Sequence, residues 1–549
     1  MEQVELSEEL LLSVRKPARY IGNEYNSIKK DWDSADVKFC LCCPDLYEIG
    51  MSNLGMKILY HILNAQEGVL CERCFTPWID MEKAMRDNHI SLFSLENKMP
   101  LAEFDILGFS FSYELSYTNM LTMLDLSGLP FQAKDRKNGK YPLIIAGGPC
   151  VVNPEPLSDF IDMFVIGDGE ESAIEIVDVY KKYKTKKGLL LDEMSKIEGV
   201  YVPSLYSGSG KIKKRTVRSL DKSSFPVKPV IPYIQTVHDR IAIEIMRGCP
   251  NNCHFCQARS VYGPVRIRER SQVVELAGDS YKNTGLDELS LLSLSSSSYP
   301  GIEKLIKELT GLFLPLGVGI SLPSLRIEDT STNLPSLISV IKKSGLTFAP
   351  EAGSDRMLHI INKNIKKEKL FSALREAFSK GWRRVKLYFM IGLPQETDED
   401  VEAIIAFAAS IAALRKDVSR QPADIVVNVS SFIPKPHTFF EREAMAGAEE
   451  LQRKQKILLH MSRPHRYLKL KFNDANISVL ESVFSRGDKN LAGPLLSAWK
   501  NGARFDAWQE TFNFDIWHRA FADCGVNMQN YLAEKGKDDN LPWSHIICG

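Results

Sequence analysis

The first 190 residues alternate short apolar runs with segments of helical periodicity. Apolar runs occupy residues 37–43, 104–112 and 142–148, and a helix is expected from about residue 52 to 65. Buried parallel strands separated by helices are typical of doubly wound α/β domains. We therefore predict a Rossmann-like α/β domain over residues 1–190.

Six further apolar runs recur between residues 240 and 436, with helical segments between them. They lie at 241–246, 288–294, 318–325, 346–353, 385–394 and 424–434. Six β/α units form a partial barrel rather than the full eight-unit barrel. Chemistry in such barrels takes place at the carboxyl ends of the strands, so the residues just after each run are the candidates for a site.

Two other stretches complete the chain. Residues 191–239 contain short β-like pieces and several prolines, which indicates a linker or hairpin layer. Within them, KIKKRTVR (211–218) could contact a polyanion, although a run of charges is usually a solvated face. Residues 437–549 alternate helical and strand-like segments, and we expect a small α+β unit that packs over the barrel mouth.

The C-terminal stretch also contains aromatic and charged residues that could line a substrate pocket. Aromatic helix faces more often belong to a core, so both interpretations stay open. The residues concerned are Arg486, Asp488, Asp506, Trp508 and Trp517.

Composition and charge set limits on the class of protein. The chain has 549 residues, 44% of them hydrophobic and 25% charged, as in globular proteins. Its 69 basic and 69 acidic residues cancel, so no global field favours nucleic acid or membrane. The acidic N-terminus lacks the pattern of a secretion signal, and no apolar run is long enough for a membrane span. Eleven cysteines in this context favour reduced thiols and predict a cytoplasmic protein without membrane contact.

The clearest motif is a cysteine triplet directly after the first apolar run of the predicted barrel. The segment MRGCPNNCHFCQAR places Cys249, Cys253 and Cys256 in C-x3-C-x2-C spacing. Three thiolates on one loop can bind three irons of a 4Fe-4S cluster and leave the fourth iron open. A tetrahedral zinc site would need four protein ligands, and no second cysteine pair follows at suitable spacing.

This motif, with Phe255 before the third cysteine and a six-unit barrel, resembles the radical S-adenosylmethionine (radical SAM) superfamily. The resemblance implies that S-adenosylmethionine binds the open iron through its amino and carboxylate groups. An electron from the reduced cluster then cleaves the sulfonium to a 5′-deoxyadenosyl radical. It also implies an electron donor such as flavodoxin or ferredoxin.

The resemblance assigns further barrel residues to the bound S-adenosylmethionine. Ser295 and Ser296 stand where the superfamily places polar groups near the methionine amine, although the usual form with two glycines and an acid is absent. Ser321 and Arg326 are matched to the methionine carboxylate, which a guanidinium can bind in bidentate fashion. For each of these residues, a strand-end polar group satisfied locally is the alternative.

Two later strand ends complete this assignment. The resemblance places Glu351, in APEAGSDRML, where it can bond the ribose. The turn IGLP, with Gly392, is matched to backbone contacts with adenine. As for the serines, local satisfaction of these loop residues is the alternative.

The end of the N-terminal domain resembles a cobalamin-binding domain. AGGPCVVNPEPL and DMFVIGDGEES place Gly147, Gly148, Gly167 and Gly169 at predicted strand ends. Glycines there would let the backbone approach a corrin or its nucleotide tail, whereas the alternative is that they form ordinary tight βα turns.

The cobalamin motif departs from the pattern of domains that ligate cobalt through histidine. Those domains carry D-x-H-x-x-G, whereas this chain reads DLYEIG with Tyr47 at the histidine position. Tyrosine is a poor ligand for cobalt, so any bound cobalamin should lack a protein histidine ligand. The resemblance implies that such cobalamin remains compatible with a radical SAM enzyme.

The C-terminal stretch, including VSSFIPKPHTFFEREAM, resembles an uncharacterised bacterial group of cobalamin-type radical SAM proteins. We therefore predict a transferase-like enzyme that methylates or rearranges an unreactive carbon of a small molecule, peptide or RNA. One alternative is a methylthiotransferase acting on tRNA or ribosomal protein, with a second cluster on Cys42, Cys71 and Cys150. Another is a non-catalytic iron-sulfur or cobalamin sensor.

Overall fold

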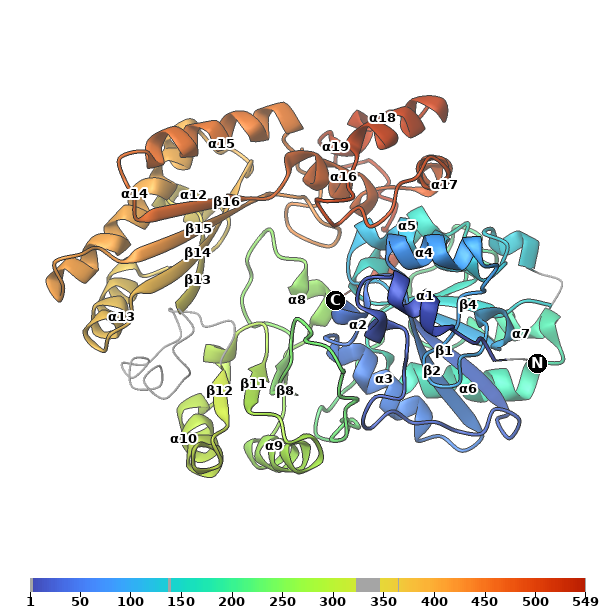
Figure 1. The fold of residues 1–549 in the computed structure, drawn as a ribbon. Helices are drawn as coiled ribbons and strands as arrows, with labels where there is room; N and C mark the ends of the chain where they lie inside the picture. The colour runs from blue at the N-terminus through green and yellow to red at the C-terminus, as the bar shows by residue number, and fades with distance from the viewer. Residues whose placement is uncertain (1–2, 137–139, 322–345, 364, 549) are drawn as a thin grey trace.

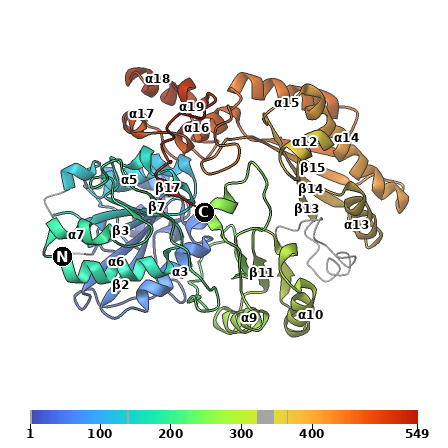
Figure 2. The same ribbon diagram turned by 180° about the vertical axis from the view of Figure 1, so that it is seen from behind.

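The computed structural model describes residues 3–136, 140–321, 346–363 and 365–548. Figures 1 and 2 show an N-terminal α/β domain, two further sheets with their helices, and a C-terminal helical unit that lies above the N-terminal domain. None of the described helices combines the length and apolar character needed to cross a membrane.

The N-terminal sheet has strand order β2-β1-β3-β4-β5-β6. Its strands are β1 (Val37–Cys43), β2 (Val69–Phe75), β3 (Ile106–Ser110), β4 (Leu143–Gly147), β5 (Met163–Val165) and β6 (Val200–Tyr201). The first five strands in this order are parallel, and β6 is antiparallel to β5. This order is that of a doubly wound sheet whose direction of winding reverses between β1 and β3. The predicted α/β domain is confirmed.

Helices cover both faces of this sheet because its strands are apolar on both sides. One face packs against α3 (Leu54–Asn64), α6 (Gly169–Tyr183) and α7 (Lys187–Met194). The opposite face packs against α4 (Ile79–Asp87) and α5 (Tyr117–Leu126). β6 also belongs to this sheet, although it lies within residues 191–239, which the sequence predicted to be a linker or hairpin layer.

The first sheet of the radical SAM-like part has strand order β12-β11-β8, all parallel. Its strands are β8 (Ile241–Glu244), β11 (Glu288–Leu292) and β12 (Gly319–Ser321), with α9 (Arg270–Thr284) and α10 (Ile302–Phe313) after β8 and β11. Just beyond β8, β9 (Met246–Arg247) pairs antiparallel with β10 (Arg266–Ile267). The first two predicted strands therefore occur where the apolar runs place them; β12 lies in the third run, 318–325, of which residues 322–325 lie outside the described residues.

A second parallel sheet follows, with strand order β13-β14-β15-β16. It contains β13 (Leu346–Glu351), β14 (Arg384–Ile391), β15 (Asp424–Ser431) and β16 (Leu468–Phe472), connected by α12 (Asp355–Ile360), α13 (Lys367–Ser379), α14 (Asp398–Leu414) and α15 (Ala448–Ser462). The other three predicted strands are thus present. β16 extends the same sheet, so residues 448–472 pack with the barrel strands although the sequence places them in the C-terminal unit.

The C-terminal unit comprises α16 (Ala475–Ser485), α17 (Ala492–Lys500), α18 (Phe514–Asp523), α19 (Gln529–Leu532) and β17 (Ile546–Ile547). It packs on α5 of the N-terminal domain, and the expectation that it covers the barrel mouth stays a prediction. Trp499 donates its indole hydrogen to the Thr122 hydroxyl at 3.0 Å, and the Phe505 amide donates to the Asn119 side chain at 2.9 Å. β17 pairs parallel with β7 (Ile212–Lys213).

Candidate active site

The cysteine loop leaves β9 and returns through β10, so the β9–β10 pairing forms its stem. Arg247 pairs with Arg266 across this stem. Gly248 opens the loop with φ of 86°, and a Cβ there would lie 2.7 Å from the Pro264 carbonyl oxygen. Only glycine accommodates both conditions. Cys249, Cys253 and Cys256 are half-buried, and α8 (Ala258–Tyr262) follows the last of them.

The cysteine loop is docked onto residues that follow strands of the second sheet. The His254 amide donates to the Ile361 carbonyl at 3.0 Å, and the Asn362 side chain donates to the Asn252 carbonyl at 2.7 Å. The Phe440 amide donates to the His254 carbonyl at 3.3 Å. The loop therefore contacts both sheets, and these hydrogen bonds fix its path between them.

The environment of the three thiols fits a 4Fe-4S cluster. Burial raises the pKa of Cys256, the backbone amides of Ala258 and Arg259 lower it, and the neighbouring Cys253 and Cys249 raise it. Overall the pKa of Cys256 is raised, and its dependence on Cys253 and Cys249 reflects the proximity of the three sulfurs on one loop.

Within the described ranges, no three His, Cys, Asp or Glu side chains are gathered closely enough to hold a single metal ion. The assignment of Cys249, Cys253 and Cys256 to a cluster therefore rests on their spacing in the sequence and on the one loop that carries them.

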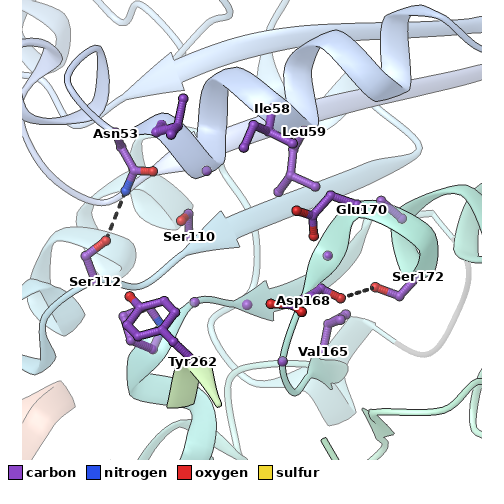
Figure 3. Close-up of a pocket in the computed structure, with 18 of the residues that line it drawn as sticks. Asn53, Ile58, Leu59, Ser110, Ser112, Val165, Asp168, Glu170, Ser172 and Tyr262 are labelled. Atoms are coloured by element: carbon purple, nitrogen blue, oxygen red, sulfur yellow. Dashed lines mark hydrogen bonds between the residues drawn. The ribbon is translucent and has the colours of Figure 1, made fainter. Parts of the chain in front are cut away.

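A cavity of about 500 Å³ lies at the carboxyl ends of β1, β3, β4 and β5 (Figure 3). Gly147, Gly148, Gly167 and Gly169 all line it. In doubly wound sheets, ligands bind at this edge, where the winding reverses. Its apolar part runs between the sheet and helices α3 and α6, and is lined by Phe39, Leu41, Leu54, Ile58, Leu59, Leu63, Ile145, Val165 and Ile176.

Three of the four predicted glycines occur in the cavity lining for different structural reasons. Gly148 and Gly167 have φ of 103° and 107°, and a Cβ on either would collide with the backbone of Phe111 or Arg215. These two glycines are therefore required by tight turns. A Cβ on Gly147 would meet only the Val165 carbonyl, at 3.8 Å, so a larger side chain there would enter the cavity.

A charged wall closes the cavity on the barrel side. Arg247 contacts Asp168 at 3.0 Å, Glu170 at 2.6 Å and Glu244 at 2.8 Å, and Arg266 also pairs with Asp168. Burial lowers the pKa of Arg247, but the surrounding carboxylates outweigh burial and raise it. These ion pairs join the N-terminal domain to Arg247, which lies two residues before Cys249. The sequence analysis missed them, although charged residues in the apolar run IAIEIMR could have indicated a buried ion pair.

The rest of the cavity rim is polar on one side. The Asn53 side chain donates to the Ser112 hydroxyl at 3.2 Å, and Tyr262 of α8 faces the same space (Figure 3). Tyr47 is not among the lining residues. Its buried hydroxyl donates to the Glu24 carboxylate at 2.9 Å. The residue at the histidine position of the cobalamin motif is therefore committed to a structural contact.

Ser295 and Ser296, predicted at the second strand end, make local hydrogen bonds. Ser295 and Ser296 are buried, and their hydroxyls lie 2.8 Å from that of Ser298 and 3.0 Å from that of Ser293. Ser321 ends β12 opposite Ser290 of β11. The preceding residues Ser293 and Leu294 line the glycine-lined cavity.

The remaining predicted positions are Arg326, Glu351 and Gly392. Arg326 lies outside the described residues. Glu351 ends β13 at a register shift with φ of 71°, an unfavourable conformation for glutamate, and its carboxylate accepts a hydrogen bond from the Lys363 ammonium at 3.1 Å. Gly392 has φ of 79°, and its amide donates to the Glu396 carboxylate at 2.7 Å.

Three of the C-terminal residues considered for a substrate pocket belong to the core. Arg486, Asp506 and Trp517 are at most 2% exposed. Trp517 donates to one Asp506 oxygen at 2.7 Å and Thr118 to the other at 2.6 Å, while burial raises the pKa of Asp506 to about 6. These contacts attach the C-terminal unit to α5.

The sequence matches two families. Residues 55–203 match the family described as "Radical SAM proteins, N-terminal", and residues 243–408 match the family described as "Radical SAM superfamily". An uncharacterized protein of Methanocaldococcus jannaschii is 31% identical over 410 residues, which cover 74% of this chain and 83% of that protein. The chain belongs to the radical SAM superfamily. Membership implies an enzyme that carries a 4Fe-4S cluster and uses S-adenosylmethionine.

Other relatives of this radical SAM protein match a smaller part. An uncharacterized methyltransferase of Pyrococcus horikoshii is 27% identical and aligns with 51% of the chain and 60% of its own length. The ribosomal protein uS12 methylthiotransferase RimO of Pelotomaculum thermopropionicum is 25% identical and aligns with 38% of the chain and 50% of its own length.

Two solved structures share the fold of this radical SAM protein. One is the radical S-adenosylmethionine methyltransferase TsrM from Kitasatospora setae with cobalamin and a 4Fe-4S cluster bound, at TM-score 0.55 and 13% identity, covering 88% of this chain and 99% of TsrM. The other is the cobalamin-dependent S-adenosylmethionine radical enzyme OxsB with aqua-cobalamin bound, at TM-score 0.50 and 13% identity, covering 88% and 72%.

Proposed function

We propose that this radical SAM enzyme binds cobalamin in the glycine-lined cavity, without a histidine ligand, and methylates or rearranges an unreactive carbon. The cavity is the observation that carries the proposal. It lies at the ligand-binding edge of a doubly wound sheet and extends as an apolar slot between the sheet and two helices. Its opposite wall is the stem of the cysteine loop.

The residues present fit a flat cofactor with an apolar tail. Gly147 leaves the cavity entrance open, and the apolar lining below it suits the nucleotide base of a corrinoid. Asn53, Ser110 and Ser112 supply polar groups at the rim for peripheral amides. The structures of TsrM and OxsB, which share the fold, contain cobalamin, and this supports the choice of cofactor.

Each group of residues has a distinct part in the proposed chemistry. Cys249, Cys253 and Cys256 would hold the cluster, and Glu351 would bond the ribose of S-adenosylmethionine. When bound, the cluster with S-adenosylmethionine supplies a carbon radical, and cobalamin supplies a transferable methyl group. The charged wall around Arg247 keeps the two cofactor regions at a fixed separation, since its ion pairs join the cavity to the cysteine loop.

The methylthiotransferase alternative is disfavoured by the N-terminal cysteines. Cys42 and Cys150 belong to the core on one face of the sheet, whereas Cys71 belongs to the core on the other face. Side chains on opposite faces of a sheet cannot bind one cluster. The sensor alternative lacks any need for S-adenosylmethionine cleavage, so formation of 5′-deoxyadenosine separates it from the proposal.

The proposed reaction also requires an electron donor and a reducing cellular compartment. We propose flavodoxin or ferredoxin as the electron donor, because the cluster requires single electrons at low potential. Ten of the eleven cysteines are buried or half-buried, which suits the reducing cytoplasm.

Anaerobic reconstitution tests the proposal. The wild-type protein should take up iron and sulfide, retain a corrinoid visible in its absorption spectrum after desalting, and form 5′-deoxyadenosine with a reductant. Cys253→Ala should lose the cluster absorbance and 5′-deoxyadenosine formation while retaining corrinoid. A wild-type protein that releases all corrinoid at saturating concentration would contradict the cobalamin part of the proposal.

A further inference from the structure

Lys214 belongs to the basic segment 211–218, yet its ammonium is buried against the cysteine loop. It donates to the carbonyl oxygens of Ser260 at 2.6 Å, Gly263 at 2.7 Å and Val261 at 3.2 Å. Only 5% of Lys214 is exposed. The segment that the sequence suggested as a solvated or polyanion-binding face therefore directs one of its lysines into the protein.

The three carbonyls lie at the C-terminal end of α8, the helix that follows Cys256. Carbonyls at a helix end have no partners within the helix, and the helix dipole makes that end negative. An ammonium with three donors can satisfy all three at once. Among the described residues, no carboxylate lies within ion-pair distance of Lys214, so these carbonyls are the main compensation for its charge. Burial accordingly lowers the pKa of Lys214.

The backbone around Lys214 is held from two sides. Its amide donates to the Ile547 carbonyl at 2.9 Å, directly after the paired residues of β7 and β17. The next residue, Arg215, donates its amide to the Ile166 carbonyl at 2.8 Å and accepts from the Asp168 amide at 3.0 Å. Lys214 is thus anchored between the C-terminal residues and the glycine turn that lines the cavity.

The helix that Lys214 contacts is itself placed between the two proposed cofactor sites. Tyr262, at its C-terminal end, lines the cavity, and Cys256 lies two residues before its start. A second contact restrains the helix, since the Ser260 hydroxyl donates to the His437 carbonyl at 2.6 Å. Movement of this helix end would shift the third cysteine and the cavity wall together.

We infer that Lys214 is a positioning residue, whose ammonium fixes the end of α8 and thereby the third cysteine relative to the cavity. This inference rests on the proposed function, because its effect appears in S-adenosylmethionine cleavage. Within the basic segment, Lys214 serves the interior of the enzyme, whereas Lys211, Lys213 and Arg218 are exposed.

Lys214→Met tests the inference, with Lys213→Met as the matched control. Lys213 is the adjacent lysine, the last residue of β7, but its side chain is 76% exposed. Lys214→Met should retain the iron content of the wild type but form 5′-deoxyadenosine about tenfold more slowly, because small misplacement of reacting groups is costly. The change that S-adenosylmethionine causes in the electron paramagnetic resonance spectrum of the reduced cluster should also differ from that of the wild type. Lys213→Met should match the wild type in all three measurements.

Two further variants keep the test decisive if Lys214→Met folds poorly. Lys214→Arg and Lys214→Gln keep hydrogen-bond donors, and both should recover part of the rate, with arginine above glutamine because it keeps the charge. Rates and spectra equal to the wild type in Lys214→Met and Lys214→Gln would overturn the inference. Loss of iron equal to that of Cys253→Ala would also overturn it, since Lys214 would then serve cluster retention. Failure of the proposed function itself is seen earlier, as a wild-type protein that forms no 5′-deoxyadenosine.

Discussion

Cys42 of β1 and Cys71 of β2 project from opposite faces of the N-terminal sheet. Across the parallel pairing of these strands, Cys42 lies beside Cys74, whereas Cys71 lies beside Phe39. Because successive side chains of a strand alternate between faces, no rotamer change can bring Cys42 and Cys71 to one metal centre. Both residues are fully buried, so their strands are held in place by packing on each face and cannot shift to bring the two thiols together.

We therefore predict a single cluster. The triple variant Cys42→Ala, Cys71→Ala, Cys150→Ala should bind about four irons per chain after anaerobic reconstitution, as the wild type does, since one 4Fe-4S cluster is held by the loop cysteines. The matched variant Cys249→Ala, Cys253→Ala, Cys256→Ala should bind none. Iron and sulfide analysis measures both. About eight irons in the wild type, reduced to four in the first variant, would contradict the prediction.

Gly147→Leu should exclude the corrinoid and leave the cluster intact. A side chain at this position meets no close neighbour and extends into the cavity, so the fold tolerates it while the space is filled. Retained corrinoid is measured from the absorption spectrum after desalting, and iron content is measured in parallel. Gly188→Leu, at an exposed glycine with open surroundings, is the control and should retain corrinoid. Equal retention by both variants would place the cofactor elsewhere.

Glu351 offers a test that separates binding from stability. Its φ of 71° disfavours any residue with a Cβ, so Glu351→Gly should be more stable than Glu351→Ala by about 1 kcal/mol. Both variants lose the carboxylate, so both should raise the KM for S-adenosylmethionine to a similar extent. Urea unfolding and the rate of 5′-deoxyadenosine formation supply the two measurements. An unchanged KM in both variants would remove Glu351 from the binding site.

The ion pairs of Asp168 should stabilise the contact between the N-terminal domain and the barrel. Asp168→Asn leaves Arg247 and Arg266 without this buried partner, and we expect a loss of about 3 kcal/mol in the free energy of unfolding. Asp398→Asn breaks a solvent-exposed pair with Arg453 and should leave the unfolding midpoint unchanged. Chemical denaturation compares the two. A similar midpoint for both variants would show that the charged wall does not hold the domains together.

Glu72 should make stability depend on pH. Burial, with the charge of Glu96, raises its pKa from 4.5 to about 7. The folded state therefore keeps a proton that the unfolded state releases, and this contribution is present below pH 4.5 and lost as pH rises through 7. Glu72→Gln removes the titration and should be more stable than the wild type at pH 8 by about 1–3 kcal/mol, with a smaller difference at pH 5. A difference that is independent of pH would contradict this assignment.

Local sequence was sufficient for the cysteine motif and for most strands of both α/β parts. The spacing of Cys249, Cys253 and Cys256 places three thiols on one short loop whatever the rest of the fold does, and long apolar runs bury as strands in any parallel sheet. For the same reason the glycines of the cavity could be identified, because a turn at a strand end is a local requirement. Only contacts with distant segments show that Gly148 and Gly167 are required by turns, whereas Gly147 leaves space in the cavity.

Only the tertiary structure decided which groups meet across the chain. Sequence could not tell that Cys42 and Cys71 face apart, because the faces follow from how two strands pair. The sequence also could not place the C-terminal helices on α5 or the Arg247 ion pairs beside the cavity. The same holds for the contact of Lys214 with the C-terminal end of α8. Each of these contacts joins residues far apart in the sequence, and their choice of partner depends on packing and burial, which have no signature in local spacing.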